Sequence, residues 1–288
     1  MTSFGTFSTT TETTIQPVEL AQWLEAAGFE SMFLGEHSHI PVSRESPFPL
    51  GGDLPYYYSH FFDPFIGLAA AASVTTRLKL GTGVVLVPEH NPIHLAKQAA
   101  CLDYVSNGRF LFGIGAGWNA EEMADHGVAF KDRWKFTRES VLAMREIWSK
   151  EEAEYHGKLV DFKPLWCYPK PVQAGGPPVL MGAGSKFVPK RIAEYCDGWV
   201  PLDGWGDLSA GLHAIREECE KIERPFEEIQ LGVMAMYDLS TPNVGIDRIG
   251  ALIEMGFTRV LLALDPALEA AAQYDVLEKH KSMIANFQ

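Results

Sequence analysis

The sequence predicts a (β/α)8 barrel, and three observations indicate it. The runs Leu80–Pro88 and Phe110–Trp118 are both apolar, are typical of β-strands and contain glycines toward their ends, and a helix-like segment follows each at once. Two such units in succession indicate parallel strands joined by crossover helices. The third observation is a pattern shared by Ala27–Leu34 and Met255–Leu262, in which a helix ends at a glycine and a strand begins soon after it. A doubly wound parallel sheet is the alternative fold.

Strands and helices alternate along the whole chain and form eight β/α pairs, which is the inventory of such a barrel. Helix starts are indicated by Pro17 and by the N-cap pairs that begin at Asp63 and Asn91, and Gly28 marks a helix end. The expected strands are Ser3–Ser8, Ser31–Gly35, Leu78–Leu86, Arg109–Ile114, Pro178–Met181, Gly198–Pro201, Gln230–Met236 and Arg259–Leu264. The expected helices are Gln16–Ala27, Asp63–Ser73, Pro92–Val105, Asn119–His126, Lys131–Ser149, Ser185–Tyr195, Leu208–Lys221, Val244–Met255 and Ala267–Ala285.

Two insertions interrupt this single expected domain of residues 1–288. Residues 38–62 form a long proline-rich loop after the second strand, so they lie on the carboxyl-end face, where a long ordered loop is typical of a lid or a pocket wall. Its aromatic residues, Tyr56–Tyr58 and Phe61–Phe62, fit either a substrate wall or a small satellite core. The second insertion, near residues 152–176, begins with an expected hairpin over Ala153–Asp161.

Composition excludes several classes of partner. The formal net charge is -13 and the pI is about 5.1, which argues against binding nucleic acid or an anionic membrane surface. The four cysteines are far apart and form no CxxC, as expected of reduced thiols in a cytoplasmic protein. No signal peptide is evident at the amino terminus, and no apolar run approaches the roughly 20 residues that span a bilayer.

The chemistry of a barrel is expected at the carboxyl ends of its strands. After the fifth strand, Gly182, Ala183, Gly184 and Ser185 run into a helix, where free backbone N–H groups favour a phosphate. The alternative is a tight turn that needs glycine only for its geometry. Gly117 and the neighbouring Trp118 follow the fourth strand, and Trp118 is equally consistent with stacking on a planar ring or with plain core.

Polar residues that follow the second and fourth strands are the other candidates. The spacing of His37 and His39 is that of a metal hydrolase, but such a site needs histidines after later strands, and the fifth and sixth strands end in none. We therefore expect no metal and a ligand-facing His37, with a structural histidine as the alternative. Glu121 and Glu122 are explained by the helix dipole at a helix start.

Together these segments resemble the luciferase-like monooxygenase family, and within it the branch of probable oxidoreductases that use coenzyme F420, a deazaflavin. The resemblance covers nearly the whole chain, and flavin and deazaflavin members share the segments concerned. The matching motifs are Gly35–Arg44, Leu80–Pro88, Gly108–Asn119, Tyr168–Pro171 and Glu194–Trp199.

The resemblance implies a barrel that holds the cofactor ring in its carboxyl-end mouth. It implies a non-proline cis peptide at Gly83-Val84, with these two residues, Gly117 and Trp118 against the ring, and it places the phosphate on Gly182–Ser185. It also implies a catalytic acid–histidine pair, Glu36 and His37, in which Glu36 orients His37 or raises its basicity. Deazaflavin sugar-phosphate dehydrogenases have a glutamate where this chain has Trp118, so the resemblance does not extend to a sugar-phosphate substrate.

The function that the resemblance implies is hydride transfer between F420 and a small organic substrate, in a homodimer. His37 is then the acid or base, or polarises the substrate oxygen. One alternative is an FMN-dependent monooxygenase that works with a separate flavin reductase. A flavin-binding barrel without turnover and a metal hydrolase are more distant alternatives.

Overall fold

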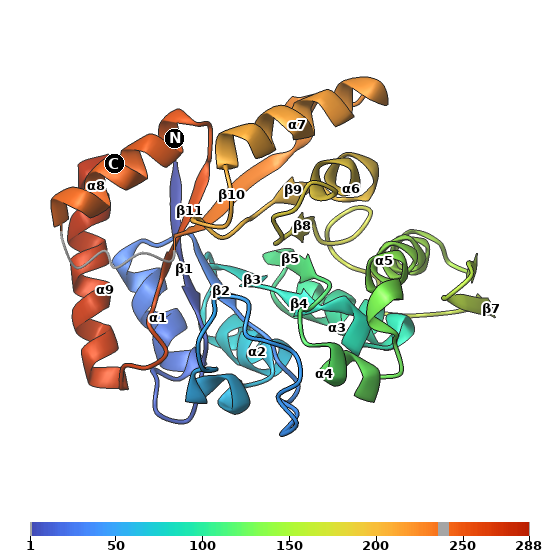
Figure 1. Cartoon of the computed structure of the whole chain (residues 1–288), viewed down its shortest axis with the longest axis horizontal. Helices are drawn as coiled ribbons and strands as arrows, with labels where there is room; N and C mark the ends of the chain where they lie inside the picture. Colours follow the sequence, from blue (N-terminus) through green and yellow to red (C-terminus); the bar gives the residue numbers. More distant parts are fainter. Residues whose placement is uncertain (1, 236–241, 288) are drawn as a thin grey trace.

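The predicted (β/α)8 barrel is confirmed. A computed structural model of the chain describes residues 2–235 and 242–287. Within these residues, the strands lie in the order β3-β2-β1-β11-β10-β9-β8-β5-β4, and a β3–β5 pairing closes the ring. Every pairing in the ring is parallel. β3 and β4 are two parts of one strand, so the described barrel has eight strand positions (Figure 1).

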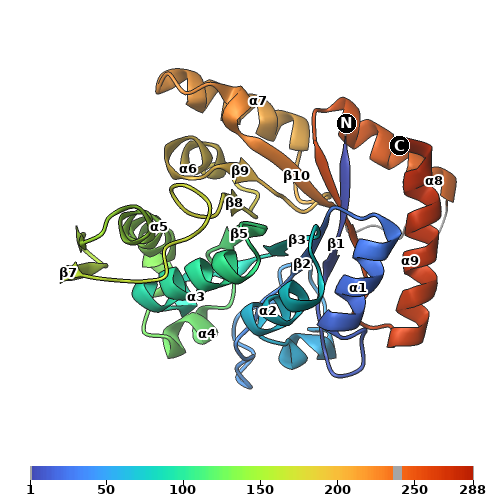
Figure 2. The same cartoon turned by 180° about the vertical axis from the view of Figure 1, so that it is seen from behind.

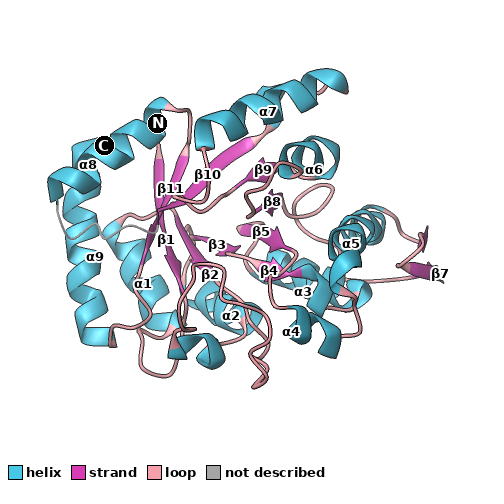
Figure 3. Ribbon diagram, viewed as in Figure 1, coloured by secondary structure: helices cyan, strands magenta, loops and turns pink. Residues whose placement is uncertain are grey.

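The helices surround the strands, as Figure 3 shows by colour. The barrel strands are β1 (Ser3–Ser8), β2 (Ser31–Leu34), β3 (Lys79–Thr82), β4 (Val85–Leu86), β5 (Phe110–Gly115), β8 (Val179–Met181), β9 (Gly198–Trp199), β10 (Gln230–Ala235) and β11 (Arg259–Ala263). The helices are α1 (Pro17–Ala27), α2 (Pro64–Val74), α3 (Pro92–Val105), α4 (Ala120–Asp125), α5 (Arg133–Ser149), α6 (Val188–Tyr195), α7 (Leu208–Lys221), α8 (Pro242–Glu254) and α9 (Ala270–Ile284).

The core has two layers, because alternate residues of each strand point into the barrel or out toward the helices. The larger layer lies between strands and helices and includes Leu20, Leu68 and Val260. A smaller cluster fills the barrel interior, and it consists of Phe33, Leu111, Leu180, Val200, Met234 and Leu261.

Most expected strands and helices of the barrel agree with the observed ones to within two residues at each end, and three differ by more. The expected strand Leu78–Leu86 is divided into β3 and β4 at the peptide between Gly83 and Val84, which is cis as the resemblance implied. Helix α6 begins at Val188 instead of Ser185, because a turn closed by the Val188 N–H and the Ser185 carbonyl precedes it. Helix α9 begins at Ala270, since a turn from Asp265 to Leu268 comes first. Met236, the expected last residue of the seventh strand, lies outside the described residues.

Both insertions lie outside the ring of strands. The long loop after β2 contains a short 3-10 helix, η1 (Tyr56–His60). The hairpin is formed by β6 (Ala153–His156) and β7 (Asp161–Leu165), so its second strand extends beyond the expected segment. Figure 2 shows it at the edge of the molecule, far from β1. None of the described helices is long and apolar enough to cross a membrane, and the four cysteines are free thiols.

An ion pair at the amino end of the barrel joins two strands that flank β1. The guanidinium of Arg259, at the start of β11, donates to both carboxylate oxygens of Glu30, at 3.0 and 2.8 Å. Burial alone would raise the pKa of Glu30, but Arg259 and Lys79 outweigh it and hold that pKa at about 2. Because the folded-state pKa is below the ordinary value of 4.5, this pair stabilises the fold fully above about pH 4.5 and loses its effect as the pH falls through about 2.

Replacing Glu30 with Gln is therefore expected to lower the free energy of unfolding by about 1.5–3 kcal/mol near neutral pH, since a buried charged hydrogen bond is lost. The difference from the unmodified protein should shrink progressively below about pH 4.5. Urea unfolding at a series of pH values measures both effects. A difference that stays constant through this range would show that the ionised carboxylate is not the stabilising group.

Candidate active site

A cavity of about 930 Å³ opens at the carboxyl ends of the strands. Its walls come from the loops that follow the strands, from the starts of α5 and α6, and from the middle of α9. All ten residues predicted as site residues line it: Glu36, His37, Gly83, Val84, Gly117, Trp118, Gly182, Ala183, Gly184 and Ser185.

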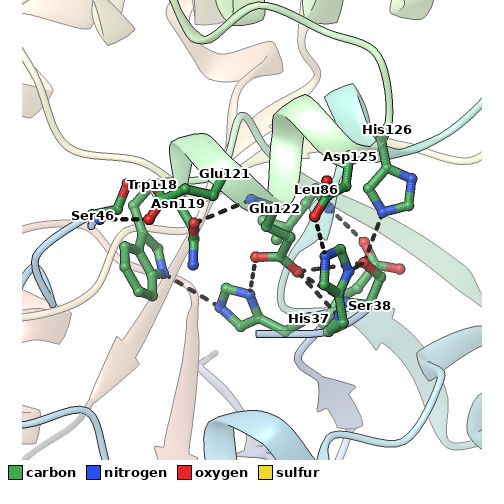
Figure 4. Close-up of polar contacts among 12 residues, drawn as sticks. His37, Ser38, Ser46, Leu86, Trp118, Asn119, Glu121, Glu122, Asp125 and His126 are labelled. Atoms are coloured by element: carbon green, nitrogen blue, oxygen red, sulfur yellow. Dashed lines mark hydrogen bonds and ion pairs between the residues drawn. The ribbon is translucent and has the colours of Figure 1, made fainter. Parts of the chain in front are cut away.

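His37 is held between two partners, as Figure 4 shows. Its Nδ1 lies 2.8 Å from the Glu122 carboxylate, and its Nε2 lies 3.3 Å from the indole Nε1 of Trp118. An indole N–H can only donate, so Nε2 of His37 must accept and Nδ1 must carry the proton that faces Glu122. The arrangement therefore fits a neutral imidazole whose Nε2 lone pair is at the cavity.

Glu122 is a site residue that the sequence reasoning missed. The Asn119 side chain caps α4 by accepting from the Glu122 N–H at 3.2 Å, which fixes Glu122 in the first turn. The fully buried carboxylate also accepts from the backbone N–H groups of Ser38, at 3.0 Å, and His39, at 3.4 Å. Burial favours a higher pKa, but the hydrogen bonds from His37 and from the His39 N–H outweigh it and lower the pKa of Glu122.

The neighbouring residue Glu121 has a different role. From the sequence alone, the helix dipole is a sufficient explanation for both acids. Glu121 accepts from the backbone N–H of Ser46 at 2.8 Å and also from the Ser46 hydroxyl. It therefore attaches the long loop to α4. The sequence signal for both roles was the segment Trp118–Glu122, in which the N-cap Asn119 follows a tryptophan and precedes two acids.

The direct pairing expected between Glu36 and His37 is wrong. Its carboxylate accepts from the Leu86 N–H at 2.7 Å and lies 3.0 Å from Nε2 of His90, and it does not contact His37. Adjacent residues on extended backbone point in opposite directions, so Glu36 and His37 face different neighbours. Burial lowers the pKa of His90, but the contact with Glu36 outweighs this and raises it.

The two histidines of the His37–His39 pair do not converge. The His39 side chain is exposed, and its Nε2 lies 3.0 Å from Asp125. The Ser38 hydroxyl lies 2.8 Å from Nε2 of His126 (Figure 4). In the part of the chain that the structure describes, no three His, Cys, Asp or Glu side chains are grouped so that they could hold a metal ion.

Val84 forms part of the cavity floor, and glycines make room for it. A Cβ on Gly182 would lie 2.2 Å from Cγ1 of Val84, and one on Gly115 would lie 2.8 Å from Cγ2. Gly117 has a φ of 71°, a conformation that favours glycine. The glycines at the ends of β5 and β8 therefore leave the space that Val84 occupies in the cavity floor.

Two arginines in the cavity wall were not predicted. Arg133 and Arg191 line the same cavity as Ser185, and Nε of Arg133 and Nη1 of Arg191 are buried without a hydrogen-bond partner among the described residues. The Arg191 guanidinium is stacked on Trp134, 4.0 Å from its ring centroid. Buried cationic donors without acceptors are costly, so this wall is suited to an anionic group. Burial lowers the pKa of both arginines.

The long loop supplies an apolar wall against His37. The rings of Tyr58 and Phe61 lie 5.3 and 5.4 Å from the imidazole, and Phe48 packs against both Tyr58 and Trp118. Burial raises the pKa of Tyr58 to about 12, so its hydroxyl stays protonated. Tyr56 and Phe62, which were predicted with this wall, are exposed and do not line the cavity.

Comparison with known families identifies the class. Residues 2–279 match the model of the luciferase-like monooxygenase family, and the chain belongs to that family. An uncharacterized protein of Mycobacterium tuberculosis (strain ATCC 25618 / H37Rv) is 37% identical over 275 residues, which cover 94% of this chain and 95% of the relative. An F420-dependent glucose-6-phosphate dehydrogenase of Mycolicibacterium fortuitum is 31% identical over 221 residues, 74% of this chain and 61% of the relative.

Solved structures share the fold at low identity. A riboflavin lyase with modified FMN and riboflavin has a TM-score of 0.77 at 16% identity, over 99% of this chain and 92% of that chain. An F420-dependent secondary alcohol dehydrogenase in complex with an F420-acetone adduct has a TM-score of 0.73 at 16% identity, over 91% and 93%.

We expect Gly182→Ala to destabilise the protein by about 1–3 kcal/mol, because the added methyl group must displace Val84 or the strand end. Denaturant unfolding measures the effect. Gly250→Ala is the control without a steric conflict, since a Cβ there meets nothing within 4 Å, and within α8 the alanine is expected to stabilise by about 0.5–1 kcal/mol. A Gly182→Ala variant as stable as the unmodified protein would show that the position of Val84 does not require glycine at residue 182.

Proposed function

We propose that this protein is an oxidoreductase that transfers a hydride between the deazaflavin coenzyme F420 and a small, uncharged organic substrate bound against His37. The observation that carries the proposal is the hydrogen bonding of His37: Nδ1 faces the Glu122 carboxylate, and Nε2 accepts only a long hydrogen bond from Trp118 at the cavity, between an aromatic wall and a glycine-lined floor. That arrangement suits removal of a proton from a substrate hydroxyl group.

The cavity fits a cofactor of this kind. Val84 and Trp118 offer apolar contacts for a planar ring, and Gly182–Ser185 and the unpartnered donors of Arg133 and Arg191 suit its phosphate. When bound, a deazaflavin supplies the acceptor or donor of the hydride. The F420-dependent relative supports this choice of cofactor.

The chain's own residues then act on the proton. His37 takes it at Nε2, where the substrate hydroxyl replaces the long hydrogen bond from Trp118. Glu122 stabilises the resulting imidazolium through the Nδ1 proton, as a buried carboxylate does for a general base. Tyr58, Phe61 and Phe48 exclude water from the reacting group and favour an apolar substrate.

The second candidate is an FMN-dependent monooxygenase that works with a separate flavin reductase. The riboflavin lyase of the same fold, whose structure contains modified FMN, supports this second candidate. The deciding experiment is a fluorescence-quenching titration of the purified protein with F420 and, separately, with FMN. Tight binding of F420 with weak binding of FMN supports the proposal, and the reverse order overturns it in favour of the oxygen-dependent reaction.

Replacing His37 with Ala is expected to lower turnover by about 10²–10⁴-fold while cofactor affinity changes much less, because a general base is lost and the ring site is kept. Steady-state kinetics on a responsive alcohol or ketone, with a binding titration, measures the two effects. His39→Ala is the matched control, since that side chain pairs with Asp125 at the surface. Retained turnover in the His37 variant would remove this residue from the mechanism.

Replacing Arg191 with Gln is expected to weaken binding of the cofactor roughly ten- to a hundredfold, the effect of losing a charge-assisted hydrogen bond of about 1.5–3 kcal/mol. The same variant should bind the cofactor without its phosphate as well as the unmodified protein does. Arg216→Gln is the control, since Arg216 is also stacked on an aromatic ring, 4.1 Å from the Phe226 centroid, but lies outside the cavity wall. Equal losses for both forms of the cofactor would place the phosphate elsewhere.

A further inference from the structure

Three carboxyl groups converge behind His37. Glu36, Glu89 and Glu122 are at most 7% exposed, and they come from the end of β2, the short 3-10 helix η2 (Val87–Glu89) and α4. Among the residues that the structure describes, no lysine or arginine forms an ion pair with any of the three. Their basic neighbours are the histidines His37 and His90. Three buried negative charges with so little compensation would be costly, so the cluster is expected to keep a proton.

Two of the three carboxyl groups have the hydrogen-bond partners expected of an ionised carboxylate. Glu122 accepts from Nδ1 of His37 and from the two backbone N–H groups that follow it. Glu36 accepts from the Leu86 N–H and contacts His90 through both oxygens. Each therefore has several hydrogen bonds that favour the charged form.

Glu89 differs from both. Its Oε2 atom is buried and receives no hydrogen bond from the described residues. Its carboxyl group is within hydrogen-bonding reach of the Glu122 carboxyl group and of the Ser38 side chain. Two buried carboxyl groups in such contact are more stable sharing one proton than both ionised. The oxygen that lacks a donor is the natural place for it.

The surrounding charges agree with this assignment. Burial, followed by the charges of Glu122 and Glu36, raises the pKa of Glu89 to about 10, whereas the contact with Glu89 helps to lower the pKa of Glu122. The ionisable groups that act on Glu89 are Glu122 on α4 and Glu36 after β2, and these two contact His37 and His90 in turn.

We propose that Glu89 is a positioning residue that holds a proton at neutral pH and donates it in a hydrogen bond to Glu122, so that Glu122 stays ionised and His37 stays neutral. An ionised Glu89 would add a second anion behind His37 and favour a permanently protonated imidazole, which has no free Nε2 lone pair. The inference rests on the proposed function only in treating His37 as a base. The protonated state of Glu89 stands on the buried cluster itself.

The first test is an NMR titration of the histidine ring signals in the protein without ligand, with His37 assigned through a His37→Asn variant. Glu89→Gln keeps the shape and a hydrogen-bond donor and removes no charge if Glu89 is already protonated. We therefore expect the titration midpoint of His37 to be unchanged. A midpoint that falls by about 1–3 pH units would mean that an anion had been removed, and would overturn the proposal.

Two further variants calibrate this readout. Glu122→Gln removes the carboxylate that touches Nδ1 and is expected to lower the midpoint by about 1–3 pH units, which shows that the signal responds to a lost anion. Glu89→Leu fills similar space without a donor, and we expect it to raise the midpoint because Glu122 becomes more basic. An unchanged midpoint in Glu89→Leu would show that the hydrogen bond to Glu122 has no effect on His37.

Infrared spectroscopy tests the unmodified protein directly, even where a variant fails to fold. We expect the C=O band of a protonated carboxyl group at neutral pH, lost in Glu89→Gln and retained in Glu36→Gln. Absence of the band from the unmodified protein would overturn the proposal. Neither readout needs cofactor or substrate. A protein that shows the band but binds no F420 would therefore contradict the proposed function and leave this inference in place.

Discussion

The hydrogen bond between Nδ1 of His37 and the buried Glu122 carboxylate is the contact on which the site depends. The same carboxylate accepts from two backbone N–H groups of the loop after β2, so one side chain fixes both the imidazole and the chain that carries it. Because Trp118 can only donate to Nε2, the two contacts together select one tautomer. Glu122 therefore links α4 to the start of the long loop and also sets the protonation pattern of His37.

A second constraint sets the opposite side of the cavity. The chain steps from β3 to β4 at Gly83-Val84, and Val84 occupies space that side chains at Gly115 and Gly182 would fill. The glycines of two other strands are thus part of the floor, and the cavity depends on how neighbouring strands of the barrel fit together. Arg133 and Arg191 complete the wall with donors that need an acceptor. An apolar floor and aromatic wall beside a cationic end describe a site for a planar molecule with an anionic tail.

Much of this could be read from the sequence, because glycine-ended strands and proline-started helices are local signals, and parallel topology brings all strand ends together. All ten predicted site residues line the cavity for that reason. Roles were harder to predict. The pairing of Glu36 with His90, and of His37 with Glu122, depends on side-chain direction after β2 and on the distant α4. Glu122 had a sufficient local explanation in the helix dipole, and nothing near Arg133 or Arg191 indicated that both face one cavity. The resemblance implied the cis peptide at Gly83-Val84, but the division of the expected strand Leu78–Leu86 into β3 and β4 at that peptide was not predicted.

The central claim is that His37 is a neutral base whose unprotonated Nε2 faces the cavity. The most direct test is the tautomeric state of His37 at neutral pH, from the ¹⁵N chemical shifts of the ring in the protein without ligand. The structure predicts a protonated Nδ1, which donates to Glu122, and an unprotonated Nε2. An Nε2-protonated ring, or an imidazolium at neutral pH, would contradict the account.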